Sequence, residues 1–494
     1  MSDVDSADGN GRRAQLSAVI SALCGDPSGA LGPSVYETSR LVSLAPWLEG
    51  HQRRIDFLVG AQEADGGWSG PGTLGLVPTL GAIEALLSSP ERTEAVTSSI
   101  EAGIRAADLL LATADRDGMP DTLISFLIVP ALVDDINKRL GRDRLALPAG
   151  ANAEALRALR DGGWRNPVSA FYLEIVGPAA VGSPYVEPSD GVIGCSAAAT
   201  AAWLGPRPPE STGPYAASAK FLVETQALLR GPVAGLTSMT YFERVWAYLA
   251  LRTAGADSTV CAALLAGLPG DLTEGGVPAA PGFAVDAEST ALLLLARAEE
   301  RGWMDEPAAL WAYDRDTHFL TTVPVGAPSV VTNARVLQAM HRYGSQDSPD
   351  RSRYVDAAER VARYLIQAQT AEGYWLDRWH TSPLYATMAC VSALHAVGAA
   401  EPVRRAVTWL SETQHEDGSW GRWGGSAEET AYALLALHAI PGAAVEAVAR
   451  GTRYLEAADG PFPAMWVGKD LYAPANLVRA AILAALPHSW KDRR

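Results

Sequence analysis

The chain has 494 residues, of which 48% are hydrophobic and 19% charged, so it carries enough apolar material for two large cores and lacks the composition of a disordered protein. Its 56 acidic residues outnumber its 40 basic ones, the net charge is −16, and no Lys/Arg-rich run occurs, which excludes nucleic acid as a partner. No apolar run approaches the roughly 20 residues that span a bilayer. We therefore expect no stable membrane insertion, and the four scattered cysteines fit a cytoplasmic protein.

A repeated segment organises the chain. Three copies share the pattern Gln-x-x-acid-Gly-x-Trp, at Gln62–Trp68, Gln369–Trp375 and Gln414–Trp420. An amphipathic stretch precedes each copy and a second apolar-periodic stretch follows it, so each unit predicts a helix, a tight glycine turn and another helix. The glutamine and tryptophan can fix this turn by hydrogen bonding and stacking, so we interpret the motif as structural. The near absence of strand patterns predicts an all-α fold.

The spacing of the copies indicates the domain organisation. The first copy lies far from the other two, and Pro/Gly-rich breaks fall at residues 177–194 and 205–213. Helix pairs in series are typical of α/α barrels, so we expect two α/α-barrel domains with the repeat in each. The polar, acidic start MSDVDSADGNGRRAQ predicts a disordered tail.

Four longer strings accompany the repeat. They are SVYETSRL at 34–41, GCSAAATAAWL at 194–204, WLDRWHTSPLYAT at 375–387 and WVGKDLYAP at 466–474. In this order they resemble segments of the bacterial class II diterpene cyclases, which are labdane-type, copalyl diphosphate synthase-like enzymes related to the squalene-hopene cyclases. The resemblance implies the βγ terpene cyclase architecture, with an active site between the barrels. Residues 1–30 would form the tail and the first helix of the β domain, 31–215 a γ-type barrel and 216–494 a β-type barrel.

The segment VDAESTA at 285–291 stands where the family has its acid motif, D-x-D-D-T-A. The resemblance implies Glu288 as the proton donor, Asp286 as its orienting partner, Ser289 as a hydrogen-bond donor to a carboxyl oxygen, and Asn333 as an amide that bonds the acid. Protonating an alkene requires a neutral carboxylic acid in a dry, apolar cavity. Two alternatives stay open, since Asp286 also suits a helix N-cap and Asn333 an exposed cap.

The same strings supply candidates for binding the diphosphate. Lys469 and Arg378 lie in them and offer charge-assisted donors to phosphate oxygens, although Arg378 replaces the family's usual lysine. Arg244 is a further candidate, whose alternative is a salt-bridged helix surface. Aromatic side chains of these segments are candidates for lining the cavity and stabilising cations, with core packing as the alternative. They are Trp375, Trp379, Tyr385 and Trp466.

The resemblance also implies Mg²⁺ as an aid to diphosphate binding. The metal ligands cannot be assigned, because Leu127 stands where many relatives have glutamate. No D-D-x-x-D motif occurs, since Asp134 and Asp135 are followed by Ile-Asn-Lys. Ionisation of the diphosphate by a metal cluster is therefore disfavoured.

These observations predict a class II terpene cyclase that protonates geranylgeranyl diphosphate and forms a bicyclic labdane, halimane or clerodane diphosphate. One alternative is a sesquiterpene cyclase that makes a drimane-type diphosphate from farnesyl diphosphate. Another is a non-catalytic α/α toroid that binds a prenyl ligand. A prenyl diphosphate is the expected small-molecule partner, and a homodimer is left open as the assembly.

Overall fold

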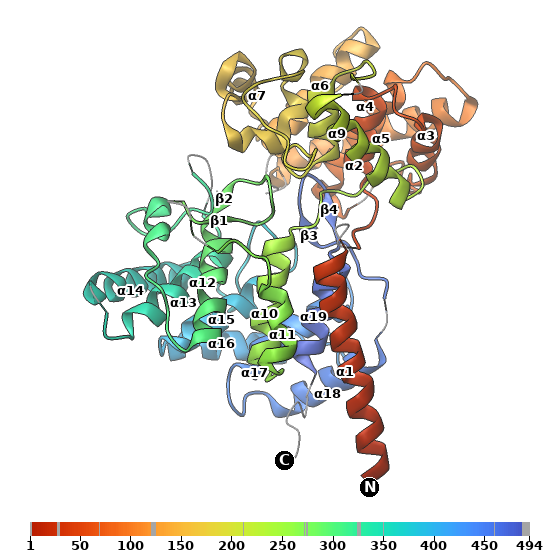
Figure 1. The fold of residues 1–494 in the computed structure, drawn as a ribbon. Coiled ribbons are helices and arrows are strands. Elements are labelled where there is room, and N and C mark those ends of the chain that lie inside the picture. The colour runs from red at the N-terminus through yellow and green to blue at the C-terminus, as the bar shows by residue number, and fades with distance from the viewer. Residues whose placement is uncertain are drawn as a thin grey trace.

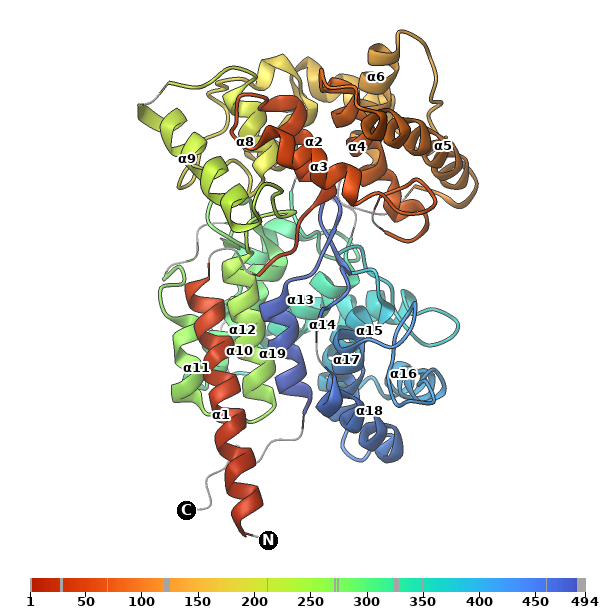
Figure 2. The ribbon, with the colours of Figure 1, turned by 90° about the vertical axis from the view of Figure 1, so that its right-hand side faces the viewer.

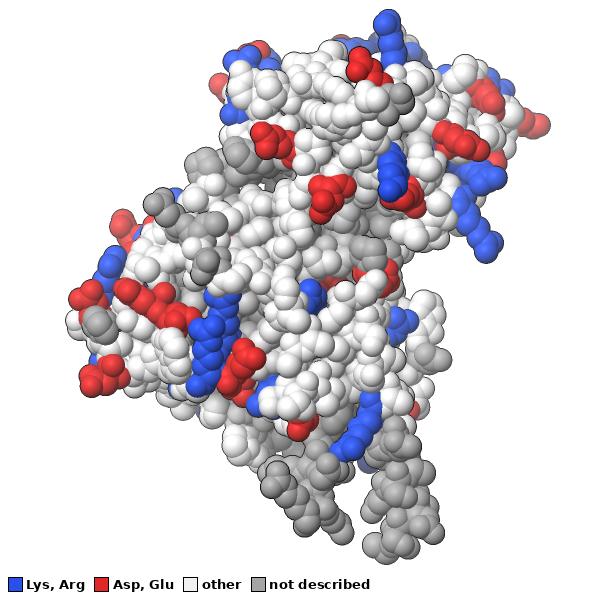
Figure 3. All heavy atoms as spheres, in the orientation of Figure 1, with Lys and Arg blue, Asp and Glu red and all other residues white. Residues whose placement is uncertain are grey.

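The chain folds into two helical barrels that meet end to end (Figures 1 and 2). The computed structural model describes residues 2–26, 30–68, 70–119, 125–210, 212–270, 272, 275–323, 328–348, 350–458 and 460–486. The predicted all-α fold of two α/α barrels is confirmed. Among the described helices, none is both long and apolar enough to cross a membrane. On the face drawn in Figure 3, basic side chains lie interspersed with acidic ones.

A closed ring of helices forms the inner wall of the C-terminal barrel. Each inner helix contacts the next in chain order, and the ring closes where α10 contacts both α12 and α19. The inner helices are α10 (Thr240–Thr253), α12 (Ala287–Arg301), α13 (Val330–Gly344), α15 (Pro383–Ala396), α17 (Ala427–His438) and α19 (Ala475–Ala485). Outside them lie α1 (Ser2–Gly25), α11 (Ser258–Leu265), the 3₁₀ segment η5 (Ala308–Tyr313), α14 (Arg351–Gln367), α16 (Ala400–Glu412) and α18 (Val445–Ala457).

The N-terminal barrel has a shorter and less regular inner ring. Contacts run from α2 to α4, α6, the 3₁₀ segment η3 and α8, and back to α2. These elements are α2 (Val35–Leu44), α4 (Leu76–Ser88), α6 (Ser125–Leu140), η3 (Pro167–Ile175) and α8 (Ala197–Leu204). The remaining segments are α3 (His51–Gly60), η1 (Gly72–Gly75), α5 (Glu94–Asp117), α7 (Ala153–Ala158), the π-helical η2 (Leu159–Gly163), η4 (Pro178–Ala180) and α9 (Gly213–Leu228).

The boundary between the barrels and the start of the first helix differ from the sequence prediction. The boundary at residue 215 is wrong, because it falls in the first turn of α9, which packs on α8 and buries Leu222 in the N-terminal core. In the structure α1 begins at Ser2, where the sequence predicts a tail before the first helix. Helix α1 packs against α10, α11 and α19 of the C-terminal barrel, so the chain enters this barrel, leaves it to form the other, and returns (Figure 2).

Each copy of the Gln-x-x-acid-Gly-x-Trp repeat joins the end of one outer helix to the next outer helix. In the second copy, the indole of Trp375 donates to the carbonyl of Leu365 at 2.7 Å, and the amide of Gln369 donates to the carbonyls of Gly373 and Pro402 at 2.7 and 2.9 Å. A Cβ on Gly373, whose φ is +108°, would lie 2.7 Å from the backbone oxygen of Arg405 on α16, the next outer helix. The first and third copies repeat these contacts through Gln62, Gly66 and Trp68 and through Gln414, Gly418 and Trp420. The motif is therefore structural, as interpreted.

Several inner helices also begin in the same way, and this start positions the site. On α12 the cap Asp286 accepts from the backbone of Ser289, and four residues after the cap Thr290 accepts the N–H of Val277 at 3.0 Å. The side chain thereby holds the preceding segment against the helix. Two hairpins precede inner helices: β1 (Val277–Pro278) pairs with β2 (Val285–Asp286) before α12, and β3 (Trp466–Val467) pairs with β4 (Leu471–Tyr472) before α19.

Candidate active site

The two hairpins lie on the side of the C-terminal barrel that faces the N-terminal barrel (Figure 1). Phe283, in the turn between β1 and β2, packs edge-on against Phe171 of η3 with ring centroids 5.5 Å apart. Asp470, in the turn between β3 and β4, accepts a 2.6 Å hydrogen bond from the hydroxyl of Ser34, the N-cap of α2. The acid motif on α12 thus begins at the junction between the barrels, as the sequence resemblance implies.

Glu288 lies in the first turn of α12 and is 6% exposed. The hydroxyl of Thr332, on the neighbouring helix α13, donates to its Oε2 at 3.1 Å. Burial raises the pKa of Glu288 to about 8, and the nearby charge of Asp377 acts in the same direction, while Arg335 opposes it. At neutral pH the carboxyl group of Glu288 is therefore protonated, which is the state that alkene protonation requires.

Asp286 has a structural task beside the acid. It is the N-cap of α12, and its Oδ1 accepts the backbone N–H of Ser289 at 2.7 Å. Burial raises the pKa of Asp286 to about 6, and hydrogen bonds from the backbone and hydroxyl of Ser289 oppose the rise. The hydroxyl of Ser289 therefore donates to a carboxyl oxygen, as the sequence resemblance implies, and the acceptor is Asp286.

The predicted bond from Asn333 to the acid, in contrast, is wrong. Its amide nitrogen donates to the carbonyls of Phe319 and Ser329 at 2.9 and 2.8 Å, and its oxygen accepts the N–H of Phe319 at 2.8 Å. Asn333 lies four residues after the cap Ser329, so it takes on α13 the anchoring position that threonine takes on α12. The donor to Glu288 is instead the preceding residue, Thr332, which sequence reasoning missed.

Asp377, from the W-L-D-R-W string, connects α13 to the loop before α15. It accepts from the hydroxyl of Ser329 at 2.7 Å and from the backbone N–H groups of Val331 and Trp379 at 3.2 and 3.1 Å. The next residue, the diphosphate candidate Arg378, is partly buried and holds its guanidinium carbon 5.8 Å from the ring centroid of Trp379. Arg378 thus follows a residue that is bonded to the start of α13, the helix whose Thr332 donates to the acid.

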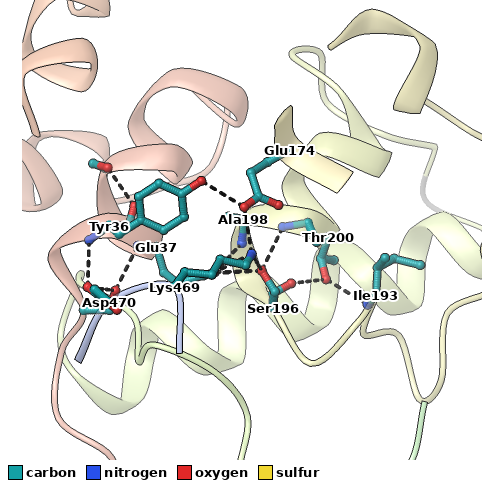
Figure 4. Close-up of polar contacts among 12 residues, drawn as sticks. Tyr36, Glu37, Glu174, Ile193, Ser196, Ala198, Thr200, Lys469 and Asp470 are labelled. Carbon is teal, nitrogen blue, oxygen red and sulfur yellow. Dashed lines mark hydrogen bonds and ion pairs between the residues drawn. The ribbon is translucent and has the colours of Figure 1, made fainter. Parts of the chain in front are cut away.

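Lys469 lies in a buried ion cluster between the barrels (Figure 4). Its ammonium is 2.9 Å from Glu37, 2.8 Å from Glu174 and 2.7 Å from the hydroxyl of Ser196. Burial alone would lower the pKa of Lys469, but Glu174 and Glu37 outweigh it and raise the pKa. Two carboxylates already compensate the single positive charge, so a diphosphate there would meet net negative charge. The structure contradicts the predicted diphosphate role of Lys469 and makes it a link between the barrels.

Arg244 lies away from the site. Its guanidinium donates to the carbonyls of Leu264 and Ala263 at 3.0 and 3.1 Å and also to that of Ala266. These are the orphan carbonyls at the end of α11, so Arg244 caps that helix. The predicted role in binding diphosphate is wrong.

Of the four aromatic candidates, Trp375 is excluded, because its indole is fully buried in the structural repeat. Tyr385 and Trp466 pack against each other with ring centroids 4.8 Å apart, next to His380 and Tyr432. The hydroxyl of Tyr385 and the indole N–H of Trp379 are buried and have no hydrogen-bond partner among the described residues. We define the aromatic cluster as His380, Tyr385, Tyr432 and Trp466.

Mg²⁺ finds no ligand set in the described part of the chain. No group of three or more His, Cys, Asp or Glu side chains there is arranged so that it could hold a metal ion. Leu127 is buried in α6, and the adjacent residues 120–124 lie outside the described ranges. The described residues therefore supply no candidate ligands for the expected Mg²⁺.

Known proteins resemble this chain over both barrels. Residues 306–470 match the family model of the squalene-hopene cyclase C-terminal domain. An ent-copalyl diphosphate synthase of Streptomyces sp. (strain KO-3988) is 39% identical over 96% of this chain and 95% of that protein. A labda-7,13-dienyl diphosphate synthase of Streptomyces clavuligerus is 35% identical over 95% of this chain and 91% of that protein. The solved ent-copalyl diphosphate synthase from Streptomyces platensis is 36% identical and has a TM-score of 0.87, covering 96% of this chain and 99% of that one.

Proposed function

Because this chain belongs to the class II diterpene cyclases, we propose that it cyclises geranylgeranyl diphosphate to a bicyclic labdane, halimane or clerodane diphosphate and leaves the diphosphate in place. The two relatives that are 39% and 35% identical to this chain are named as synthases of ent-copalyl diphosphate and labda-7,13-dienyl diphosphate. The observation that carries the proposal is Glu288, a buried carboxylic acid with a pKa of about 8, at the junction of the two barrels.

The reaction begins with proton transfer from Glu288. The O–H bond of its carboxyl breaks, the π electrons of the terminal alkene form the new C–H bond, and a tertiary cation remains on the substrate. Burial strengthens the electrostatic interactions of the site and keeps water from the cation. The rings of Tyr385 and Trp466 offer π faces to positive charge, each contributing on the order of 1–2 kcal/mol when desolvated. Glu288 regains a proton from solvent after the product leaves.

The diphosphate is a remote handle in this reaction, so its binding energy serves to hold the chain in place. Arg378 is our proposed contact, because it is the diphosphate candidate that the structure leaves near the helix starts of α13 and α15. Magnesium as an aid to this contact and a homodimeric assembly are proposals that rest on the sequence resemblance alone. A cytoplasmic location is a proposal supported by the free cysteines Cys24, Cys195, Cys261 and Cys390.

The test is incubation of the purified protein with the C10, C15 and C20 prenyl diphosphates, followed by dephosphorylation and identification of the products. We expect a bicyclic product from the C20 substrate. A drimane-type product from the C15 substrate alone would favour the sesquiterpene alternative. Binding of all three without conversion would favour the non-catalytic toroid, against which the protonated state of Glu288 argues.

A further inference from the structure

A second glutamate repeats the position of the acid on another inner helix. Residues 286–291 read DAESTA and residues 426–431 read SAEETA, and each string begins at a helix N-cap. In each, the threonine four residues after the cap accepts a backbone N–H from the preceding segment, at 3.0 Å in both cases. Glu288 on α12 and Glu428 on α17 therefore start from equivalent points on the same rim of the barrel.

The surroundings of Glu428 differ from those of Glu288. Glu428 is fully buried, and its Oε1 accepts three hydrogen bonds from the aromatic cluster: from His380 at 3.1 Å, Tyr432 at 3.0 Å and Trp466 at 2.7 Å. Nδ1 of His380 accepts the N–H of Ser382 at 3.0 Å, so the ring proton lies on Nε2 and points at Glu428. Three donors converge on one oxygen and hold the carboxyl group of Glu428 in a fixed orientation.

The second carboxyl oxygen of Glu428, Oε2, differs from Oε1 in its surroundings. Oε2 is buried and has no hydrogen-bond partner among the described residues, which is costly for a charged group unless a ligand or water meets it. Tyr472 on β4 lies near both glutamates: burial first, then the charges of Glu243, Glu428 and Glu288, raise its pKa. The charges of Glu288 and Glu428 thus both act on Tyr472 at this rim of the barrel.

We propose that Glu428 is the base that ends the cyclisation. The assignment rests on the proposed function, since it concerns the cation that Glu288 creates. A C–H bond next to the cationic carbon breaks, its electron pair becomes the new C=C bond, and the proton moves to Oε2 of Glu428. The hydrogen bonds to Oε1 hold the carboxylate in place while Oε2 reacts. Release of this proton to solvent returns Glu428 to its ionised form, and the net reaction is an isomerisation.

Two matched variants test the assignment with geranylgeranyl diphosphate in H₂¹⁸O. Glu428→Gln keeps an acceptor for the three donors but cannot take a proton, so the cation survives until water captures it or another C–H bond breaks. We expect the native alkene to fall on the order of tenfold or more, with ¹⁸O-labelled alcohol or isomeric alkenes in its place. Glu429→Gln removes the next carboxyl of the same helix, equally buried and bonded to the N–H of Arg422 at 2.8 Å, and should keep the native product.

A folded Glu428→Gln variant that keeps the native product and rate, or that makes no cyclised product, would overturn the assignment. If Glu428→Gln does not fold, Glu428→Asp decides, because it keeps the charge and withdraws the carboxyl by one methylene. A mixed product profile from Glu428→Asp supports the base, and the wild-type profile refutes it. Wild-type protein that leaves the C20 substrate unchanged would refute the proposed function itself, which separates the two failures.

Discussion

The hydroxyl of Thr332 on α13 donates to Oε2 of Glu288 on α12 at 3.1 Å, and both side chains are buried where these inner helices begin. The bond stabilises the carboxylate and so lowers the pKa of Glu288, against the larger rise that burial causes. The strength of the acid is therefore set by two opposed effects, and a single methyl-for-hydroxyl exchange can change their balance.

Thr332→Val should slow protonation without weakening substrate binding. The variant keeps the shape of the side chain and loses the donor, so the pKa of Glu288 rises and the proton is harder to transfer. We expect kcat to fall on the order of tenfold with KM unchanged. Thr332→Ser, which keeps the donor, is the control and should stay near the wild-type rate. Equal rates for the valine and wild-type proteins would show that the bond does not tune the acid.

Glu288→Gln should abolish cyclisation, because the amide has no acidic proton, while binding of the substrate persists. Its stability gives a second readout. The native carboxyl has a pKa of about 8 against an ordinary value of 4.5, so between these values the native state holds a proton that the unfolded chain has released. The stability of the wild type relative to the variant should therefore fall as the pH rises through this window. Denaturant unfolding at pH 5 and pH 8 measures it, and a parallel pH dependence would contradict the raised pKa.

The rate of the wild-type enzyme should fall as the pH rises through about 8, because Glu288 is the acid only while it is protonated. Above this value kcat should drop about tenfold per pH unit. Thr332→Val should move the falling limb to higher pH, which ties the limb to Glu288. A falling limb that the variant does not move would assign the limb to another group.

Lys469→Met should destabilise the protein because it leaves Glu37 and Glu174 buried without their counter-charge. We expect a loss of about 3–5 kcal/mol in the free energy of unfolding, and partial recovery when Glu174→Gln is added. The control is Lys220→Met, since Lys220 pairs with Glu224 at 3.6 Å on the exposed surface, where such pairs contribute little. A raised KM with unchanged stability would instead restore the diphosphate role that the sequence predicts for Lys469.

The fold is predictable from the sequence because the residues of the repeat themselves make the contacts that join its helices. Each Gln-x-x-acid-Gly-x-Trp unit brings a glycine turn and two side chains that bond backbone carbonyls, and these contacts recur in all three copies. The same regularity predicts the place of Trp375, which has the position of Trp68 and Trp420 and so belongs to the repeat. Trp375 therefore bonds the end of the preceding outer helix, as Trp68 and Trp420 do, and does not line the cavity.

The site was predictable at Glu288 and Asp286 but less so around them. Asn333 and Thr332 are neighbours, and the rotation of α13 about its axis decides which of them reaches the acid. This rotation depends on the packing of the helix and cannot be predicted from the sequence motif. Lys469 lies far in sequence from Glu37 and Glu174, so their ion cluster forms only through the packing of two barrels. The position of Glu428 is predictable from the sequence, because SAEETA is identical to DAESTA at four of six positions.

The departure from the family's acid motif gives the last prediction. Glu288→Asp withdraws the carboxyl by one methylene, about 1.5 Å, which removes it from Thr332 and from the alkene. Such a displacement can slow the reaction on the order of a hundredfold, so this variant should be impaired but active. Ser289→Asp restores the family's third carboxyl, but position 289 bonds Asp286 and not the acid, so the new charge would lie beside Asp286. We therefore expect the double variant to show the sum of the two single losses in activation free energy. Turnover of both single variants and the double variant measures it, and recovery in the double variant would show that the two departures from the family motif are coupled after all.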